Sequence, residues 1–272
     1  MSKQLKTLGI DLEVTGALGW TYDIFKGRMH HIEFDPMIMC LSYGWYDRTK
    51  PKDKRRGKIH HERVNIKFED IVLNGGIKAR NAEEELVRKA WKLLDEADEV
   101  MAFNGDRFDD KVLIGAFMRY RLGMPSPYVT IDPFKMSKVA KFVSHSLENL
   151  CRSLGIPGKA EITHSTIWRD FIAGDSKAKR LMKAYNDIDV ERMFDVFEIV
   201  FTYAKTKLKI NMSSHRNGAF CCNWCGNSDL QARGVKTFGT GTYQYYWCKN
   251  PDCHKYPRER IADKEHERAA LV

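Results

Sequence analysis

The sequence lacks several patterns that would assign it to a common class of protein. It contains no apolar run of about 18 residues, the length that predicts a membrane-spanning helix. The short apolar stretch near the N-terminus is interrupted by Asp11 and Glu13, so it does not resemble a signal peptide. Serine and cysteine nucleophile motifs and internal repeats are also absent. We therefore expect no membrane association, and a location in the cytoplasm or at the nucleoid.

What the sequence does contain is enough apolar material for a folded core. Hydrophobic residues make up 43% of the 272 positions and aromatic residues 11%, which argues against a disordered chain. A length of this order is typical of one or two domains.

Positive charge is concentrated in two segments of the chain. The formal net charge is +9, of which +6 falls on 48–58 and +5 on 207–272. The rest of the chain is slightly acidic. Localised positive charge indicates a polyanionic partner, although a solvated surface would explain charge alone equally well.

The pattern of apolar residues predicts alternating strands and helices. The predicted strands are 5–12, 36–46, 59–68, 100–103 and 128–131, and the predicted helices are 81–97 with Asn81 as N-cap, 108–122, 146–154 with Ser146 as N-cap, and 175–206. The basic segment 47–58 is predicted to be an exposed hairpin loop. This order predicts an α/β sheet whose antiparallel strands come first and whose parallel strands follow.

Two carboxylates are predicted to share one face of the first strand. Asp11 and Glu13 are two residues apart, which is the side-chain period of a strand. Like charges on one face repel each other unless a cation lies between them, and Mg²⁺ and Mn²⁺ prefer such oxygen ligands. A pair at the wet end of a strand is the alternative interpretation.

Further acidic residues follow later elements. Asp109 comes after the strand at 100–103 and a turn at Asn104-Gly105, and Asp110 next to it is an alternative. Tyr185 and Asp189 lie four residues apart on the last long helix and therefore share a face. Asp187 between them is predicted to point elsewhere.

Together these motifs resemble those of the DEDD superfamily of 3′–5′ exonucleases. The segments are D-L-E-V-T on the first strand, N-G-D-R-F-D after a later strand, S-L-E-N-L-C-R-S-L-G-I at 146–156, and Y-N-D-I-D on the last long helix. The spacing within N-G-D-R-F-D is most similar to that of family-B polymerase proofreading domains. The resemblance, which covers about residues 5–205, implies a ribonuclease-H-like fold with a mixed five-stranded sheet flanked by helices.

The resemblance also implies a catalytic apparatus. Asp11, Glu13, Asp109 and Asp189 match the carboxylates that hold two Mg²⁺ or Mn²⁺ ions, with Asp11 bridging both. Tyr185 matches the residue that defines the tyrosine subclass, and it would orient the attacking water rather than act as a base.

The same resemblance implies a substrate site. Main-chain atoms from Leu12 to Thr15, and the side chains of Asn104 and Phe108, would hold the terminal nucleotide of a single-stranded DNA or RNA with a free 3′ end. DNA is the expected substrate, and a replication or repair protein is a further expected partner.

Cysteine is concentrated near the C-terminus. Cys222 and Cys225 form one metal knuckle, and Cys248 and Cys253 form a second, longer one. The segment between them alternates like a small hairpin, so the pattern predicts a zinc ribbon with one structural Zn²⁺. The alternatives to these ligands are Cys221 in place of Cys222 and His254 in place of Cys253.

The predicted ribbon is basic and rich in aromatic residues: Trp224, Phe238, Tyr243, Tyr245, Tyr246 and Trp247. This composition is typical of a surface that binds nucleic acid, although half of these rings could pack the hairpin itself and protein docking is a third interpretation. We expect an exonuclease domain over 1–206, a linker over 207–217, the ribbon over 218–257 and a charged tail over 258–272.

The function expected from the sequence is a 3′–5′ exonuclease with a nucleic-acid-binding ribbon. Two other functions remain open. One is a nucleic-acid-binding or polymerase-docking module without activity, and the other is a structure-specific endonuclease that uses the same metal site.

Overall fold

The computed structural model describes residues 6–22, 29–48, 50–105, 109–158, 166–204, 215–216, 219–222, 224–238, 241–253 and 255–262. These residues form two compact units. The core unit comprises Lys6–Trp45 and Gly57–Phe201, and the C-terminal unit combines Tyr46–Arg56 with the described residues after Phe201. The domain limits expected from the sequence stay a prediction, because most of the linker lies outside the described residues.

The core unit contains the predicted five-stranded mixed sheet. Its strand order is β5-β4-β1-β6-β7. The strands are β1 (Thr7–Val14), β4 (Ile38–Tyr46), β5 (His60–Arg63), β6 (Glu99–Met101) and β7 (Val129–Ile131). The pair β4–β5 is antiparallel, whereas β1–β6 and β6–β7 are parallel. The expected fold class is therefore confirmed.

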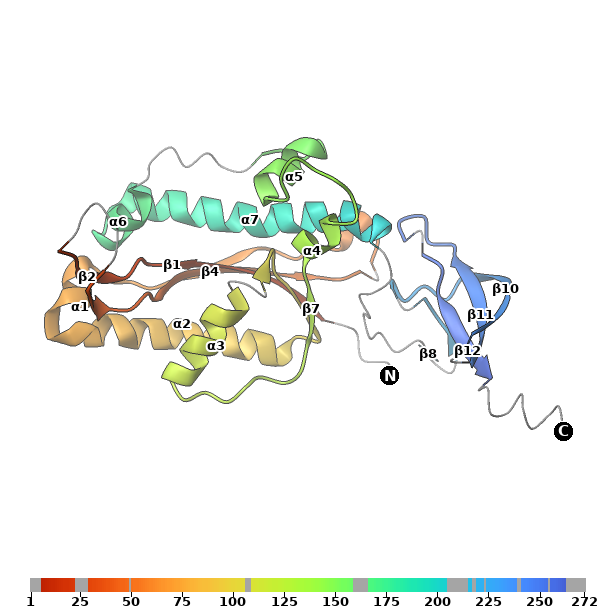
Figure 1. Cartoon of the computed structure of the whole chain (residues 1–272), viewed down its shortest axis with the longest axis horizontal. Coiled ribbons are helices and arrows are strands. Elements are labelled where there is room, and N and C mark those ends of the chain that lie inside the picture. Colours follow the sequence, from red (N-terminus) through yellow and green to blue (C-terminus); the bar gives the residue numbers. More distant parts are fainter. Residues whose placement is uncertain are drawn as a thin grey trace. The chain divides into compact units, whose positions relative to one another are not determined.

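Helices cover both faces of this sheet. Figure 1 shows α7 on one face, with α2 and α3 on the other. The helices are α1 (Phe68–Val72), α2 (Ile77–Glu96), α3 (Asp109–Arg119), α4 (Pro133–Ser137), α5 (Leu147–Ser153), α6 (Ile167–Ile172) and α7 (Ser176–Tyr203), with a 3₁₀ turn η2 (Leu73–Gly76) before α2. Among the residues that the structure describes, no helix has the length and apolar character needed to cross a membrane.

A glycine on β1 lets α7 lie close to the sheet. A Cβ atom on Gly9 would come within 2.4 Å of the Phe194 ring of α7, so only glycine fits here. Gly9, Asp11 and Glu13 alternate with the buried Leu8, Ile10 and Leu12, and so share the face toward α7. The carboxylates of β1 consequently face α7.

Several predicted boundaries differ from the structure. Helix α2 begins at Ile77 after the left-handed Gly76, so Asn81 lies inside the helix and is not its N-cap. Ser146 does cap α5, since its Oγ accepts a hydrogen bond from the backbone N–H of Asn149. The helices α1, α4 and α6 were not predicted, because their short segments carry no extended helical pattern.

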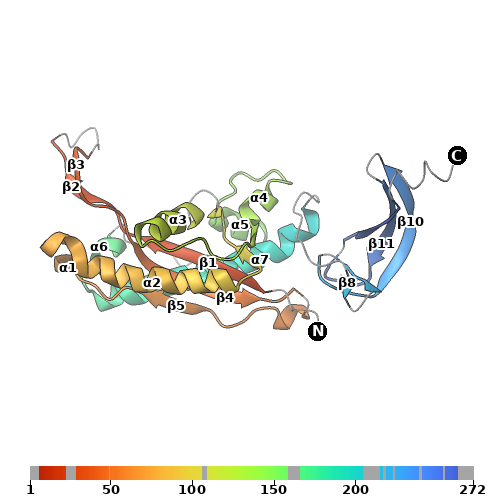
Figure 2. The same cartoon turned by 90° about the horizontal axis from the view of Figure 1, so that it is seen from below.

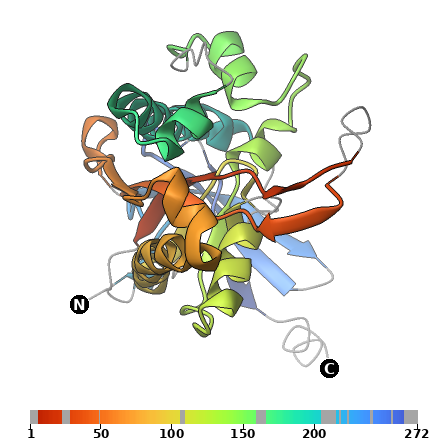
Figure 3. The same ribbon diagram turned by 90° about the vertical axis from the view of Figure 1, so that its left-hand side faces the viewer.

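A two-stranded arm that the sequence did not predict follows β1. It consists of β2 (Leu18–Trp20) and β3 (His31–Phe34), which pair in the antiparallel sense. Figures 2 and 3 show this arm extending from the sheet. Its side chains are mostly exposed, so it lacks the apolar alternation by which a half-buried strand is recognised.

The C-terminal unit contains the predicted hairpin and one strand more. The antiparallel pair β10 (Leu230–Phe238) and β11 (Gly241–Cys248) confirms the hairpin. Strand β12 (Arg258–Ala262) pairs with the other edge of β11, and the short strands β8 (His215–Arg216) and β9 (Ala219–Phe220) pair with each other. The expectation of a charged tail from residue 258 is therefore wrong for 258–262. The alternation of basic and acidic residues over 258–260 follows the two-residue side-chain period of a strand.

The basic loop is less exposed than its composition suggests. Arg48 and Arg55 are only 5% and 8% exposed. The guanidinium of Arg55 donates to the backbone carbonyl of Lys50 and lies 3.5 Å from the carboxylate of Asp252. The loop also contains the 3₁₀ turn η1 (Lys52–Lys54). The prediction of a wholly exposed loop is therefore wrong for Arg48 and Arg55, and the ion pair with Asp252 places Arg55 against the second cysteine knuckle.

Candidate functional site

The structure brings three carboxylates into electrostatic contact with Asp11. Its pKa is raised well above the usual range, first by burial and then by the charges of Asp109, Asp189 and Glu13. A hydrogen bond from the side chain of Asn186 opposes this rise. The four carboxylates named from the sequence therefore form one cluster, which we call the carboxylate cluster.

Asp109 begins α3 and is almost completely buried. Burial and the neighbouring Asp110 raise its pKa to about 7, while hydrogen bonds from its own N–H and from that of Leu12 lower it. The contact with Leu12 joins α3 to β1. Asp110 is half-buried and does not contribute to the shift of Asp11. The structure thus favours Asp109 over Asp110.

Helix α7 brings a tyrosine, an amide and a carboxylate to the cluster. Asp189 is buried, and Tyr185 lies one turn before it, half-buried on the same face. Asn186 is 0% exposed and donates a hydrogen bond from Nδ2 to Oδ2 of Asp11. Asn186 was missed, although it lies inside the Y-N-D-I-D motif. Asp187 points elsewhere, as predicted, and accepts a hydrogen bond from Ser42 of β4.

A tryptophan orients the second carboxylate of β1. The indole Nε1 of Trp168 in α6 donates to Oε2 of Glu13 at 3.0 Å. No sequence pattern indicates this contact, because Trp168 lies in a helix of six residues that carries no motif.

Of the four expected substrate-binding residues, the structure describes three, and the backbone N–H of Leu12 donates to Asp109. Thr15 is buried and pairs with Met37, since its N–H donates to the Met37 carbonyl and its Oγ1 accepts from the Met37 N–H. Asn104 has a left-handed backbone with a φ of 60°, and its N–H donates to the carboxylate of Asp132. Phe108 lies outside the described residues.

The cluster has the donor set of a divalent-ion site. Its oxygen ligands are those that Mg²⁺ and Mn²⁺ prefer, and the raised pKa values of Asp11 and Asp109 show that the negative charges are close and partly buried. A cation placed among them would relieve this repulsion. Hydrogen bonds to Asp11 and Glu13 already hold two of the carboxylates in place, as outer groups do around metal ligands.

The four cysteines of the knuckles form a tighter cluster. The Sγ atoms of Cys222, Cys225, Cys248 and Cys253 all lie within 4.8 Å of one another, and all four residues are buried. Among the described residues this is the one group of three or more potential ligands that meets that spacing. Cys221 is buried but is not part of the cluster, and His254 lies outside the described residues. The structure brings together the four cysteines predicted from the sequence, and their geometry suits a structural metal ion. That they bind zinc stays a prediction.

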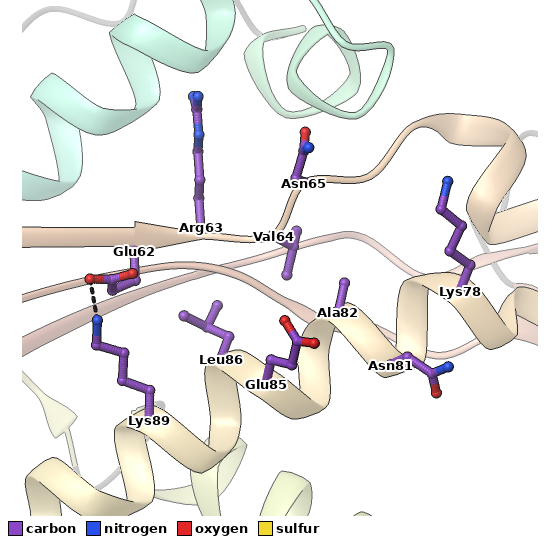
Figure 4. A pocket seen from close by; sticks show the side chains of 10 residues that line it. All are labelled: Glu62, Arg63, Val64, Asn65, Lys78, Asn81, Ala82, Glu85, Leu86 and Lys89. Atoms are coloured by element: carbon purple, nitrogen blue, oxygen red, sulfur yellow. Dashed lines mark hydrogen bonds and ion pairs between the residues drawn. The ribbon is translucent and has the colours of Figure 1, made fainter.

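A groove of about 510 Å³ lies between β5 and α2 of the core unit, and no residue of the carboxylate cluster lines it. Figure 4 shows its lining, where Glu62 bonds Lys89 and the remaining polar groups are of mixed charge. None of the site residues expected from the sequence lines this groove.

Comparison with models of known protein families assigns the core unit to a superfamily. A family model of the RNase H superfamily matches residues 65–201. The chain belongs to the RNase H superfamily. The match includes Asp109, Tyr185 and Asp189, but it begins after β1 and so leaves out Asp11 and Glu13. Membership of this superfamily supports a nuclease-like hydrolase.

The chain also has a remote similarity to a solved structure. A family B DNA polymerase from the hyperthermophilic archaeon Pyrobaculum calidifontis matches with a TM-score of 0.47 and 11% identity. The alignment covers 89% of this chain and 32% of the polymerase, so the chain spans about a third of that protein's length. No curated protein sequence matches the chain.

Proposed function

We propose that this protein is a two-metal-dependent 3′–5′ exonuclease that hydrolyses single-stranded nucleic acid, with DNA preferred over RNA. The observation that carries the proposal is the position of Asp11, whose pKa is raised first by burial and then by the charges of three further carboxylates from β1, α3 and α7. Nucleases of this fold class need such a cluster to hold divalent ions. The four-cysteine cluster would hold one structural Zn²⁺ in a ribbon that binds nucleic acid.

Each residue of the cluster has a role in this proposal. Asp11 would contact both divalent ions, Glu13 and Asp189 would complete one site, and Asp109 would help to hold the other through water. When bound, the ions would stabilise negative charge on the attacking and leaving oxygens. Tyr185 would orient the attacking water through its hydroxyl.

Two hydrogen bonds orient the carboxylates of β1 without any bound ion. The hydrogen bonds from Asn186 to Asp11 and from Trp168 to Glu13 fix the two carboxylates of β1 relative to α7 and α6. Pre-oriented ligands lower the cost of assembling the site. This support favours a working site over a decayed one.

The test is a cleavage assay with the full-length protein and Mg²⁺ or Mn²⁺. Single-stranded DNA labelled at its 5′ end should shorten stepwise, whereas a strand blocked at its 3′ end should persist. Asp11→Ala should abolish cleavage, and Glu191→Ala, which removes an exposed carboxylate from α7, should not. Full activity in Asp11→Ala would falsify the assignment.

Closed circular single strands separate the two nuclease functions. A strict exonuclease leaves a circle intact, whereas an endonuclease with the same site converts it to linear strands. RNA of the same sequence, compared at the same ion concentration, measures the sugar preference.

A further inference from the structure

The sheet of the C-terminal unit has two chemically different faces. In the antiparallel register, Tyr243 lies opposite Lys236, and Tyr245 lies opposite Arg258. Directly opposed residues share a face, and residues two apart on one strand share it too. One face, here called the aromatic face, therefore carries four rings: Phe238, Tyr243, Tyr245 and Trp247.

These rings form a surface, because no second layer among the described residues covers them. Phe238 and Trp247 are 41% and 38% exposed, and β10 is exposed from Gln231 to Phe238. The Phe238 ring centroid lies 6.0 Å from that of Tyr243 and 6.4 Å from that of Tyr245. The aromatic face is thus a continuous patch of rings that solvent reaches.

Cations lie directly over this patch. The distances from cation to ring centroid are 4.7 Å for Arg258 and Tyr243, 5.6 Å for Lys236 and Tyr245, and 4.6 Å for Arg233 and Trp247. Arg260 opposes Tyr243 across the strand pair and adds a fourth positive charge to the same face. Rings and cations therefore alternate over a short distance.

Acidic and structural groups lie on the other face. Glu259 falls between two arginines of β12, so its side chain points away from them, and its carboxylate accepts a hydrogen bond from the Tyr246 hydroxyl. The Tyr246 ring contacts Phe220 with centroids 5.1 Å apart. Trp224 is buried beneath the ammonium of Lys255. Two of the six aromatic residues named from the sequence thus pack the unit itself, and the other four form the aromatic face.

We propose that the aromatic face binds an unpaired nucleic-acid strand, with its bases stacked on the rings and its phosphates held by the four cations. The proposal deepens the proposed function and rests on it, since the strand would be of the class that the carboxylate cluster hydrolyses. Exposed rings can stack on unpaired bases, whereas bases inside a duplex are not available to them. Four cations, and no carboxylate among the strand residues described on this face, favour a polyanion over an apolar protein partner.

The test measures binding with cleavage switched off. Full-length Asp11→Ala is titrated into a fluorescent single-stranded oligonucleotide, an abasic chain of the same length, and a duplex. The single strand should bind at least about tenfold more tightly than the abasic chain, because stacking is lost with the bases. Poly-glutamate serves as a competitor that offers negative charge without bases, and it should compete poorly.

Variants of the aromatic face locate the site. Tyr245→Ala and Trp247→Ala should each weaken single-strand binding by at least about fivefold. Tyr245→Phe keeps the ring and should bind almost as the parent does. The control is Val235→Ala, which changes a side chain that is 53% exposed on the opposite face of β10 and should leave binding unchanged. Zinc content of each variant verifies that the unit is still folded.

The outcomes separate this inference from the proposed function. Equal binding of the abasic chain, equal competition by poly-glutamate, or equal loss in Val235→Ala would overturn the stacking site, even if the parent cleaves DNA. Loss of binding in the ring variants, together with no cleavage by the parent, would retain the site and overturn the exonuclease.

Discussion

The amide nitrogen of Asn186 donates a hydrogen bond to the carboxylate of Asp11, and so joins α7 to β1 within the carboxylate cluster. Asn186 is fully buried, and it is the uncharged neighbour that opposes the rise in the pKa of Asp11. The other three groups around Asp11 are carboxylates that repel it. Asn186 therefore fixes one oxygen of Asp11, and in the proposed function the second oxygen would contact the divalent ions.

Asn186→Ala should weaken the binding of divalent ions. Without the amide, Asp11 loses the hydrogen bond that lowers its pKa and is less well oriented for a metal. We expect the Mg²⁺ concentration for half-maximal cleavage to rise about 10- to 100-fold. A Mg²⁺ titration of cleavage rate measures it. Asn81→Ala, which removes an amide beside the groove of Figure 4, is the control. An identical Mg²⁺ dependence for both variants would contradict the role of Asn186.

Asp187→Asn should destabilise the fold in a pH-dependent way. Burial raises the pKa of Asp187, but hydrogen bonds from His61, Lys183 and Ser42 outweigh it and lower the pKa to about 2. A carboxylate whose pKa is lowered on folding stabilises the fold fully above its ordinary pKa near 4. This stabilisation is lost as the pH falls through about 2. Near neutral pH we expect a loss of about 2 kcal/mol in the free energy of unfolding.

Urea unfolding of Asp187→Asn and the parent at several pH values measures this effect. The difference between them should shrink as the pH falls from about 4 toward 2. Glu191→Gln, an exposed change on the same helix, should alter the free energy of unfolding by less than about 0.5 kcal/mol. A difference for Asp187→Asn that stays constant with pH would show that the carboxylate charge is not what stabilises the fold.

Glu83→Ala should destabilise the core unit strongly. The carboxylate of Glu83 is buried and accepts hydrogen bonds from Arg80, the Tyr120 hydroxyl and the Ile38 N–H, with Arg119 at 3.3 Å. Its removal leaves these groups without their shared acceptor, so we expect a loss of about 3 kcal/mol or more.

Thermal or urea unfolding tests this prediction. The matched control on the same helix is Glu84→Ala, whose partner Arg88 is exposed, and which should cost less than about 1 kcal/mol. Similar losses for the two variants would contradict the special role of the buried carboxylate.

The four-cysteine cluster should bind one zinc ion per chain. Elemental analysis of the purified protein should find one equivalent, and Cys222→Ser or Cys253→Ser should abolish it. Cys221→Ser should retain zinc, because Cys221 lies outside the cluster. A chelator should make the C-terminal unit sensitive to proteolysis, since metal binding contributes to the folding of such small units. Zinc retained in Cys253→Ser would show that another residue completes the site.

Local patterns were enough to predict most elements of the core unit. The period of two in β1 places Asp11 and Glu13 on one face, and the spacing of four places Tyr185 and Asp189 together on α7. Cysteine spacing likewise predicted the ligands of the second cluster. These features depend only on residues that are near in sequence, so the backbone period fixes them in advance.

Contacts between distant segments were decided only by the tertiary structure. It placed Asn186 against Asp11 and Trp168 against Glu13, and it selected Asp109 over Asp110. No local period encodes such contacts, because each joins segments that are far apart in the chain. The contact of Asn186 with Asp11 also depends on how closely Gly9 lets α7 approach the sheet. In the C-terminal unit, likewise, strand pairing places four rings and four cations on one face of the sheet and Glu259 on the other. The sequence by itself determined which chemical groups are present and how they are spaced along each element, and packing determined which of them meet.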